Sequence, residues 1–372
     1  MKICFYNATA SFLHGGLETY CWEAGHALAR RGHEVTIVAG EGGPARQPDV
    51  GLVTFPIRRE PEWPDIGTRF QRFMERMSLA RRALPHLLAA RHDAIVINKP
   101  FDFPALWWAR RRGLRAQIAF RSGGTEFYPL DRFFSRAVDH WISTSRYNAD
   151  QVEAHYHLPV TVIHNGVDTA LFSPGAREPD WRRGHGVPDN ALLALSVGRL
   201  VGWKGQRVII EAIAELPGAH YALVGDGPEK SVLAGLAQRL GIAGRVHFIG
   251  SVKHGELPRM LRQADLFVQP SIGEESFGIS VVEAMACELP VLASRNGGLV
   301  EIVGDGATGR LLPVGDVAAW RAAIADLDTD RDALRRMGVA ARARAEAEFT
   351  WAANARKLEQ VLNTGVTQCA AS

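Results

Sequence analysis

Short strand-like runs that alternate with longer helical patterns constrain the fold of this chain most strongly. Apolar runs rich in β-branched residues recur along both halves, and short connections join them to helical patterns. Such alternation requires parallel sheets with helices on both faces. We therefore predict an α/β fold of two doubly wound, Rossmann-like domains in tandem. The expected strands are Lys2–Tyr6, Val35–Ala39, Leu52–Pro56, Ala94–Ile97, Gln117–Phe120, Trp141–Ser143 and Val160–Ile163, then Leu192–Val197, Tyr221–Val224, Val246–Ile249, Leu266–Val268, Val291–Ala293 and Arg310–Leu312.

The stretch from Asn165 to Asn190 is the expected linker, because it is rich in proline and glycine and poor in apolar residues. We predict an N-terminal domain at residues 1–168, a C-terminal domain at 169–350 and a final helical segment at 351–372. Ligands of open parallel sheets bind at the carboxyl ends of the strands, and two facing sheets would enclose a cleft. The loops after the strands are therefore where chemistry is expected.

The net charge of +3 is nearly balanced, which argues against a nucleic-acid binder. Residues 1–165 carry +5 and the remainder −2, so two bodies with different partners are indicated. Four cysteines without CxxC spacing and scattered histidines argue against a disulfide framework and a metal site. No apolar run has the ~18–20 residues of a membrane span, and the N-terminus lacks a secretory signal. We expect a cytoplasmic protein that binds no metal.

The segment Pro270–Ala286 follows an expected strand and opens a helix. Glu283 is the one charge on that otherwise apolar helix, where an unpaired carboxylate would be costly. Adjacent ribose hydroxyls could satisfy it, and so could a protein arginine or a backbone amide. The amides near Phe277 and Gly278 lie at the positive end of the helix, which suits a phosphate or a polar sugar. Glu275 is expected in the loop above the helix start.

Arg199 and Lys204 share the loop Gly198–Gly205 after another expected strand. Two fixed cations at the carboxyl end of a strand suit a diphosphate, because each adds charge-assisted hydrogen bonds. They would also stabilise negative charge on a departing diphosphate. A solvated loop with ordinary surface cations is the alternative interpretation.

Gly15 and Gly16 follow the first strand and open a helix, so their backbone amides could approach an anionic ligand. A tight strand-to-helix turn is the alternative, and it is favoured more strongly for the turn Gly225-Asp226-Gly227. Neither segment is the GxGxxG dinucleotide fingerprint, which disfavours an NAD-dependent dehydrogenase.

Arginines interleave with apolar residues over 69–92, and Trp107-Trp108 with Arg110–Arg112 follow. Basic amphipathic helices of this kind can rest on anionic lipid. The same pattern fits a helix whose apolar face packs on the sheet while its arginines lie in water.

Together these segments resemble retaining glycosyltransferase family 4, whose members have the GT-B fold of two Rossmann-like domains facing a central cleft. The resemblance spans nearly the whole chain, and several ordered motifs at family spacing are more specific than any one of them. The motifs are Gly198-Arg199, Lys204-Gly205, Gly225-Asp226-Gly227, Glu275-Ser276-Phe277-Gly278, Glu283-Ala284-Met285-Ala286, Leu289-Pro290-Val291, Gly297-Gly298 and Glu301-Ile302-Val303, with Asn165–Asp168 similar to the interdomain turn.

The resemblance implies a role for each motif. Arg199 and Lys204 would hold the donor diphosphate and act in catalysis. Glu275 would act with them at the transferred sugar, and Glu283 would bind the nucleotide ribose. The N-terminal domain would bind the acceptor, and the final helix would pack back on it. The expected donor-binding residues are Gly15, Gly16, Gly198, Arg199, Lys204, Gly225, Glu275, Ser276, Phe277, Gly278 and Glu283.

One departure from the family pattern concerns the acceptor. Many relatives carry a histidine at the end of an N-domain strand near the reacting sugar, whereas the segment Phe120–Glu126 has none. The candidates on the acceptor side are His14, Arg121, Ser122 and Glu126.

The resemblance therefore predicts a retaining transferase that moves a mannose-, glucose- or GlcNAc-type unit from a UDP- or GDP-sugar to a hydroxyl of a glycan or lipid-linked acceptor. No cofactor or metal is expected. The basic N-terminal half suggests an anionic or lipid-linked acceptor on the inner face of a bacterial membrane, with peripheral contact to anionic lipid. The Arg/Ala/Gly-rich composition fits a GC-rich bacterium, and in such an organism we expect a role in envelope polysaccharide or lipopolysaccharide biosynthesis. The alternatives are a sugar-nucleotide epimerase of the same fold and a catalytically silent subunit that binds a nucleotide sugar.

Overall fold

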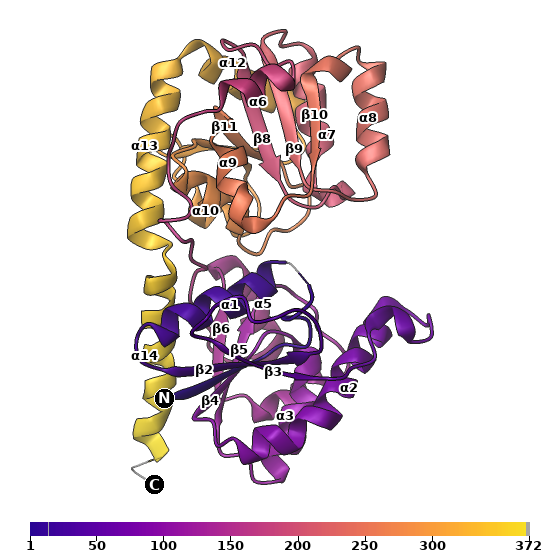
Figure 1. Cartoon of the computed structure of the whole chain (residues 1–372), viewed down its shortest axis with the longest axis vertical. Coiled ribbons are helices and arrows are strands. Elements are labelled where there is room, and N and C mark those ends of the chain that lie inside the picture. The colour runs from indigo at the N-terminus through magenta and orange to yellow at the C-terminus, as the bar shows by residue number, and fades with distance from the viewer. Residues whose placement is uncertain (14, 370–372) are drawn as a thin grey trace. The chain divides into compact units, whose positions relative to one another are not determined.

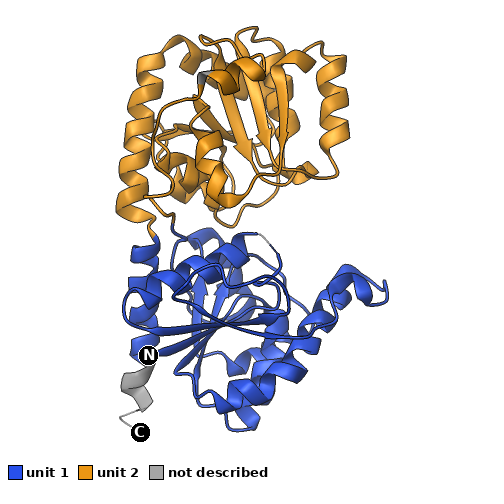
Figure 2. Ribbon diagram, viewed as in Figure 1, with its two compact units in different colours: residues 1–166, 351–372 blue, residues 167–350 orange. Residues whose placement is uncertain are grey.

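The computed structural model describes residues 1–13 and 15–369 of the chain (Figure 1). The chain folds into two compact units (Figure 2). Unit 1 comprises residues 1–166 and 351–372, and unit 2 comprises residues 167–350. The division at residue 166 lies two residues before the predicted one at 168, and the segment from Trp351 belongs to unit 1.

Unit 1 is built on a parallel sheet with the strand order β3-β2-β1-β4-β5-β6-β7. The strands are β1 (Lys2–Tyr6), β2 (Glu34–Gly40), β3 (Gly51–Phe55), β4 (Ala94–Ile97), β5 (Gln117–Ser122), β6 (His140–Ser143) and β7 (Thr161–Val162). The helices are α1 (Gly16–Ala29), α2 (Thr68–Ala89), α3 (Phe103–Arg111), α4 (Asp131–Phe134), α5 (Arg146–Tyr156) and α14 (Trp351–Cys369), with 3-10 turns η1 (Glu60–Glu62), η2 (Pro100–Asp102) and η3 (Ser135–Ala137).

Both faces of this sheet are covered by helices, as a doubly wound fold requires. Trp22 of α1 and Leu358 of α14 belong to the core cluster on one face. Leu79 of α2, Leu106 of α3 and Val152 of α5 belong to the cluster on the other. The final helix therefore completes the core of unit 1 from a distant point in the sequence.

Unit 2 repeats the plan with the strand order β10-β9-β8-β11-β12-β13, again all parallel. The strands are β8 (Leu192–Val197), β9 (Ala219–Val224), β10 (Val246–Gly250), β11 (Leu266–Gln269), β12 (Val291–Ser294) and β13 (Gly309–Leu312). The helices are α6 (Pro179–Gly184), α7 (Gln206–Ala214), α8 (Lys230–Arg239), α9 (Leu257–Leu261), α10 (Ile279–Ala286), α11 (Leu299–Ile302), α12 (Val317–Thr329) and α13 (Arg331–Glu348), with η4 (Gly202–Lys204), η5 (Ala243–Arg245) and η6 (His254–Glu256).

The prediction of two doubly wound Rossmann-like sheets is confirmed. Each predicted strand is present, and its ends lie within two residues of the predicted ones. The reason is local: a strand covered on both faces is a nearly continuous apolar run, as β8 is with the sequence LLALSV, in which Ser196 is the one polar residue.

The predicted linker at 165–190 is wrong for most of its length, because the chain packs on unit 2 from Val167 onward. Phe172 is buried in the unit 2 core. Arg182 of α6 is 3% exposed, and its guanidinium donates to the Asp265 carboxylate at 2.7 Å and to the Gln263 carbonyl. Prolines and glycines in this stretch shape turns around a short anchored helix and do not mark a free connection.

Helix α2 departs from the expectation that its arginines lie in water. Arg69, Arg72, Arg81 and Arg82 are exposed. Arg76, in contrast, is buried and forms an ion pair with the Asp102 carboxylate at 2.6 Å. A buried pair of this kind is costly to break by removing one partner, so Arg76 has a structural role.

Candidate active site

The carboxyl edge of the unit 2 sheet carries those predicted donor residues that belong to unit 2. The loops after β8, β11 and β12 are joined by backbone hydrogen bonds. The amides of Ile272 and Gly273 both donate to the Trp203 carbonyl, at 2.9 and 3.0 Å. The Gly298 amide donates to the Glu275 carbonyl at 2.7 Å. Residues far apart in the sequence therefore share one polar surface.

Two glycines make this close approach of loops feasible. Gly205 and Gly297 both have positive φ angles, of 69° and 54°. A Cβ atom on Gly205 would lie 2.0 Å from the Pro270 carbonyl oxygen, and one on Gly297 would lie 2.2 Å from that of Glu275. These positions therefore require glycine for both conformation and space.

Lys204 and Glu275 form an ion pair at the centre of this edge. Their Nζ and Oε2 atoms lie 2.9 Å apart, and the two side chains are 15% and 14% exposed. The same carboxylate oxygen accepts hydrogen bonds from Ser271 Oγ at 3.1 Å and Gln269 Nε2 at 3.3 Å. Lys204 and Glu275 were predicted from separate motifs, and here they form a direct contact. The Ser271 hydroxyl and the Gln269 side-chain amide, which were not predicted, also bind the carboxylate.

Arg199 differs from Lys204. Its side chain is exposed, and within the described residues no hydrogen bond or ion pair involves its guanidinium. Its backbone carbonyl accepts a hydrogen bond from Gln206 Nε2 at 3.1 Å. Lys204 is therefore held by Glu275, whereas Arg199 is exposed, and the diphosphate-binding role of both cations stays a prediction.

Glu283 of α10 is 5% exposed, as its apolar setting predicted. Among the described residues, its side-chain partner is a histidine and not the arginine or amide considered above. Its Oε1 atom lies 2.7 Å from Nε2 of His254, a residue in η6 that sequence analysis missed. The His254 ring also contacts the ring of Phe172 at 5.2 Å. The buried carboxylate thus faces a polar neighbour that is itself half-exposed.

The remaining predicted donor residues contribute mainly backbone. Phe277 is buried, and its ring packs on Phe349 at 5.9 Å, so only its main chain is placed to meet a ligand. Gly278, with φ of 105°, precedes α10, and Ser276 lies half-buried in the same loop. Gly198 and Gly225 approach each other after β8 and β9, because a Cβ on Gly225 would lie 2.0 Å from the Gly198 carbonyl oxygen.

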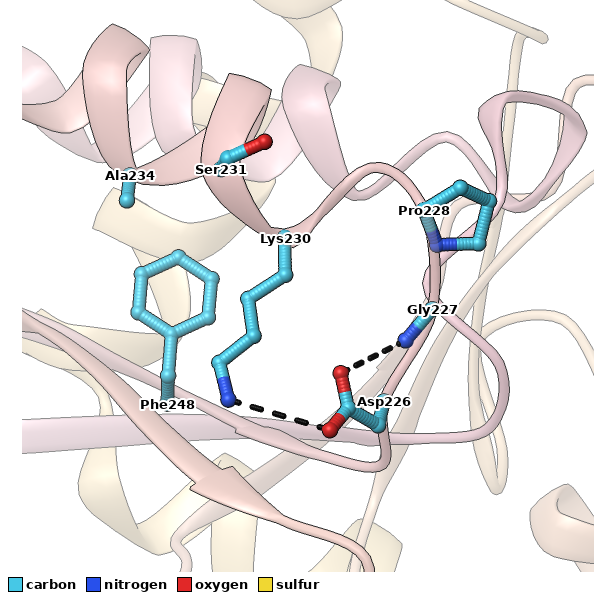
Figure 3. Close-up of a pocket in the computed structure, with 7 residues that line it drawn as sticks. All are labelled: Asp226, Gly227, Pro228, Lys230, Ser231, Ala234 and Phe248. Atoms are coloured by element: carbon cyan, nitrogen blue, oxygen red, sulfur yellow. Dashed lines mark hydrogen bonds and ion pairs between the residues drawn. The ribbon is translucent and has the colours of Figure 1, made fainter.

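An open hollow lies beside this edge, between the turn after β9 and the start of α8 (Figure 3). Asp226 and Lys230 form an ion pair at 3.8 Å there, and the Gly227 amide donates to the Asp226 carboxylate at 2.8 Å. The charged groups of the hollow thus bind each other, and none of the predicted donor residues lines it. Its lining residues are Asp226, Gly227, Pro228, Lys230, Ser231, Ala234 and Phe248.

In unit 1, the start of α1 lies next to the carboxylate of Glu18. Glu18 is buried, and a Cβ on Gly15 would lie 2.8 Å from one of its carboxylate oxygens. The other oxygen accepts a hydrogen bond from Thr9 Oγ1. Glu18 is not among the residues predicted from the sequence, although a glutamate three residues after an N-cap is a known helix signal. The donor-binding role of Gly15 and Gly16 stays a prediction, and His14 lies outside the described residues.

Arg121 lies on β5 and is 2% exposed. Its guanidinium donates to the Asn165 side-chain oxygen and lies 3.7 Å from the centre of the Tyr20 ring. Burial lowers its pKa, and its Nε atom has no hydrogen-bond partner among the described residues. Arg121 is therefore a buried cation at the strand end where an acceptor-side residue was expected.

The other two acceptor-side candidates are less free. Ser122 is buried and donates to the Gly124 carbonyl at 2.9 Å. Glu126 pairs with Lys99 at 2.8 Å and with Arg72 at 3.5 Å. Burial opposes ionisation of Glu126, but Lys99 and Arg72 outweigh it and lower the pKa of that carboxyl. Glu126 is thus an ionised partner of two cations.

Two further observations concern the described residues as a whole. No group of three or more His, Cys, Asp or Glu side chains among them is arranged to hold a metal ion. No helix in that part of the chain combines the length and the apolar character needed to cross a bilayer.

Two protein-family models match the chain. The model for Glycosyltransferase Family 4 matches residues 14–171, and the model for Glycosyl transferases group 1 matches residues 177–344. GDP-mannose-dependent alpha-(1-6)-phosphatidylinositol monomannoside mannosyltransferase of Mycolicibacterium smegmatis is 33% identical over 278 residues, which are 68% of this chain and 72% of that protein. D-inositol 3-phosphate glycosyltransferase of the same species is 37% identical over 215 residues, 56% of this chain. The chain matches 46% of that relative's length.

Solved structures share the whole fold at low sequence identity. Sucrose-phosphate synthase from Thermosynechococcus elongatus has a TM-score of 0.82 and 24% identity, with 100% of both chains covered. Anabaena Alr3699/HepE in complex with UDP and glucose has a TM-score of 0.80 and 24% identity, with 98% of this chain and 99% of that chain covered. Two parallel Rossmann-like units with these matches define a glycosyltransferase of the GT-B fold.

More specifically, the chain belongs to glycosyltransferase family 4. The resemblance read from its motifs is thereby confirmed, and so is its class as a transferase enzyme.

Proposed function

We propose that this enzyme transfers a hexosyl unit of the mannose, glucose or GlcNAc type from a nucleoside diphosphate sugar to a hydroxyl of a glycan or lipid-linked acceptor, with retention at the anomeric carbon. The observation that carries the proposal is the Lys204–Glu275 pair, with an exposed Arg199 in the same loop as Lys204. The names of the relatives, one GDP-mannose-dependent and one structure solved with UDP and glucose, support a nucleotide-sugar donor.

In the proposed reaction, the bond between the anomeric carbon and the diphosphate oxygen breaks, and a bond to the acceptor oxygen forms. The acceptor proton passes to the departing diphosphate oxygen. Negative charge grows on that diphosphate, and Lys204 and Arg199 stabilise it. Glu275 contacts the transferred sugar. The Glu283 carboxylate, which lies against His254, binds the ribose hydroxyls. Unit 2 therefore binds the donor, and unit 1 binds the acceptor.

Retention by double displacement would need a free carboxylate nucleophile beside the anomeric carbon. Glu275 accepts hydrogen bonds from Lys204, Ser271 and Gln269, and Glu283 lies against His254. Because both carboxylates are already engaged, we favour front-face attack assisted by the diphosphate itself. No metal is needed in this scheme, because the protein's own cations balance the charge of the leaving group.

We further propose that the enzyme works in the cytoplasm, at the inner face of a bacterial membrane, in envelope polysaccharide or lipopolysaccharide assembly. The name of the mannosyltransferase relative contains a phosphatidylinositol-based acceptor, which supports a lipid-linked acceptor here. A similar fold in WaaG, a glycosyltransferase involved in lipopolysaccharide biosynthesis, is compatible with an envelope acceptor.

The test is a thermal-shift screen of nucleoside diphosphates and their sugars, followed by product analysis. A binding donor raises the melting temperature. With an acceptor, the product linkage should keep the donor's anomeric configuration, and a chelator should leave turnover unchanged. An inverted linkage would refute retention. Nucleotide and epimerised sugar from donor alone would indicate the epimerase, and binding without turnover across a wide acceptor panel would indicate a silent subunit.

A further inference from the structure

An aromatic and basic surface on unit 1 lies outside the residues assigned to donor or acceptor. It is formed by α3, the turn after it, and α4 with η3. The large apolar side chains Trp108, Phe133 and Leu130 are exposed by 51%, 42% and 72%. Trp107 joins the two elements, because its ring lies 5.3 Å from that of Phe133. We name this surface the α3–α4 patch; its residues are Trp107, Trp108, Leu130, Phe133, Arg111, Arg112, Arg115, Arg132 and Arg136.

The charge of the α3–α4 patch is uniformly positive. All five of its arginines are exposed. Within the described residues, none of them forms an ion pair with a carboxylate; the nearby Asp139 pairs with Arg110, and Arg132 lies 3.4 Å from His157. Five uncompensated cations around exposed apolar side chains are the combination that binds an anionic lipid surface.

The backbone adds an independent observation. Leu130 has φ of 72° and ψ of 0°, the left-handed conformation, and its side chain points into solvent. A branched residue there costs about 1–2 kcal/mol, which glycine or asparagine would avoid. An apolar phase placed against the α3–α4 patch would cover this exposed side chain.

We propose that the α3–α4 patch docks this enzyme on the surface of an anionic lipid bilayer. Nucleic acid, which also attracts arginine and aromatic side chains, fits less well. Bases stack on ring faces, and here Arg111 lies over one face of Trp107 at 4.4 Å and Arg112 over one face of Trp108 at 4.0 Å, which reduces the ring surface open to a base. Leucine offers no stacking surface at all.

This surface replaces the basic helix at 69–92 as the lipid contact. In α2, Arg76 is buried against Asp102, and the ring of Phe73 contacts Phe101 and Tyr128 at 6.4 Å. Leu84 and Leu88 pack against the core of unit 1. The apolar face of α2 is therefore occupied inside the protein, and among the described residues the exposed large apolar side chain beside its arginines is Ile66, which precedes the helix.

This proposal rests on the lipid-linked acceptor of the proposed function. Its test measures vesicle binding and does not depend on catalytic turnover. The full chain is sedimented with vesicles of phosphatidylcholine alone, or of phosphatidylcholine with about one-third phosphatidylglycerol. Binding is expected only to the anionic vesicles, and added salt should weaken it. Three glutamines, R111Q/R112Q/R115Q, should lower the partition coefficient about 100-fold. The pair W108A/L130N, in which asparagine suits the left-handed backbone, should lower it about tenfold.

The matched control removes the same number of charges from α2, as R69Q/R81Q/R82Q, and should change the partition coefficient little. Melting curves check that each variant folds, and the nucleotide thermal shift on the same samples reports donor binding separately. The proposal is overturned if the wild-type chain ignores anionic vesicles. It is also overturned if the α2 variant loses as much binding as the α3 variant, or if these substitutions abolish binding to an oligonucleotide while vesicle binding is absent.

Discussion

Replacing Lys204 by methionine and Glu275 by glutamine, singly and together, separates the stability of their ion pair from its part in catalysis. A fully buried pair costs about 3–5 kcal/mol when one partner is removed. These side chains are 15% and 14% exposed, so solvent relieves part of that cost. We expect K204M to destabilise the enzyme by about 2 kcal/mol, which lowers the melting temperature by roughly 4–8 °C for a unit of this size.

The effect on turnover should be larger and should not be relieved by the second substitution. Loss of one cation that stabilises the departing diphosphate lowers kcat by about 10²–10³. In K204M/E275Q the unpaired carboxylate is gone, and Ser271 and Gln269 can still donate to the amide oxygen of the new side chain. The double variant should therefore recover most of its stability while turnover stays at or below that of the weaker single variant.

Calorimetry gives the melting temperatures, and nucleotide release under saturating donor and acceptor gives kcat. A double variant that regained both stability and turnover would show that the pair serves folding alone. Full turnover of K204M with unchanged donor affinity would remove Lys204 from the mechanism. Either result would refute the assignment on which the proposed function depends.

Three further predictions concern a glycine in the donor-site loops, the stability of unit 2 at acid pH, and the final helix. Gly297→Ala places a methyl 2.2 Å from the Glu275 carbonyl oxygen at a φ of 54°, so it should abolish the nucleotide thermal shift and cost roughly 3 kcal/mol. Burial and the neighbouring His220 lower the pKa of His247 from 6.5 to about 4. Between these pH values the unfolded chain therefore binds more protons than the folded chain. The free energy of unfolding of unit 2 should fall by about 1–2 kcal/mol as the pH falls from 6.5 to 4. Removing residues 351–372 exposes the core of unit 1 and should make that unit the first target of limited proteolysis.

Each of these predictions has its own control. Gly241 has φ of 70° but nothing within 4 Å of an added Cβ, so Gly241→Ala should cost only about 1 kcal/mol and keep nucleotide binding. Equal losses in the two glycine variants would mean that strain, not contact with the neighbouring loop, is responsible. An unchanged acid melting profile in His247→Gln would contradict the second prediction. Resistance of unit 1 to protease after truncation would contradict the third.

Much of the fold could be read from the sequence because its signals are local. A strand such as β8 is apolar at every position but Ser196, and short connections join such strands to helical patterns. The candidate donor residues could be predicted for a related reason. Parallel strands place the loops that follow them at one edge, so separate motifs after β8 and β11 had to lie near each other.

What the sequence did not reveal depends on pairing between distant residues. Arg182 and Asp265 are 83 positions apart, and no residue near Arg182 in the sequence indicates that its partner directly precedes β11. His254 pairs with Glu283 across 29 positions, from a turn with no pattern of its own. The periodicity of apolar residues indicates which face of a helix or strand is buried. It does not indicate which buried charged residues form pairs with each other.

Arg121 shows why that distinction matters for function. The buried arginines Arg76 and Arg182 each face a carboxylate, at 2.6 and 2.7 Å, so the fold neutralises them. Arg121 is equally buried, yet in the described part of the chain its contacts are the Asn165 amide oxygen and the Tyr20 ring. An apolar side chain would fill such a position at lower cost if packing were the sole demand. The predicted acceptor-side role of Arg121 thus rests on a charge that its surroundings leave uncompensated, at the end of a strand where Rossmann-like sheets bind their ligands.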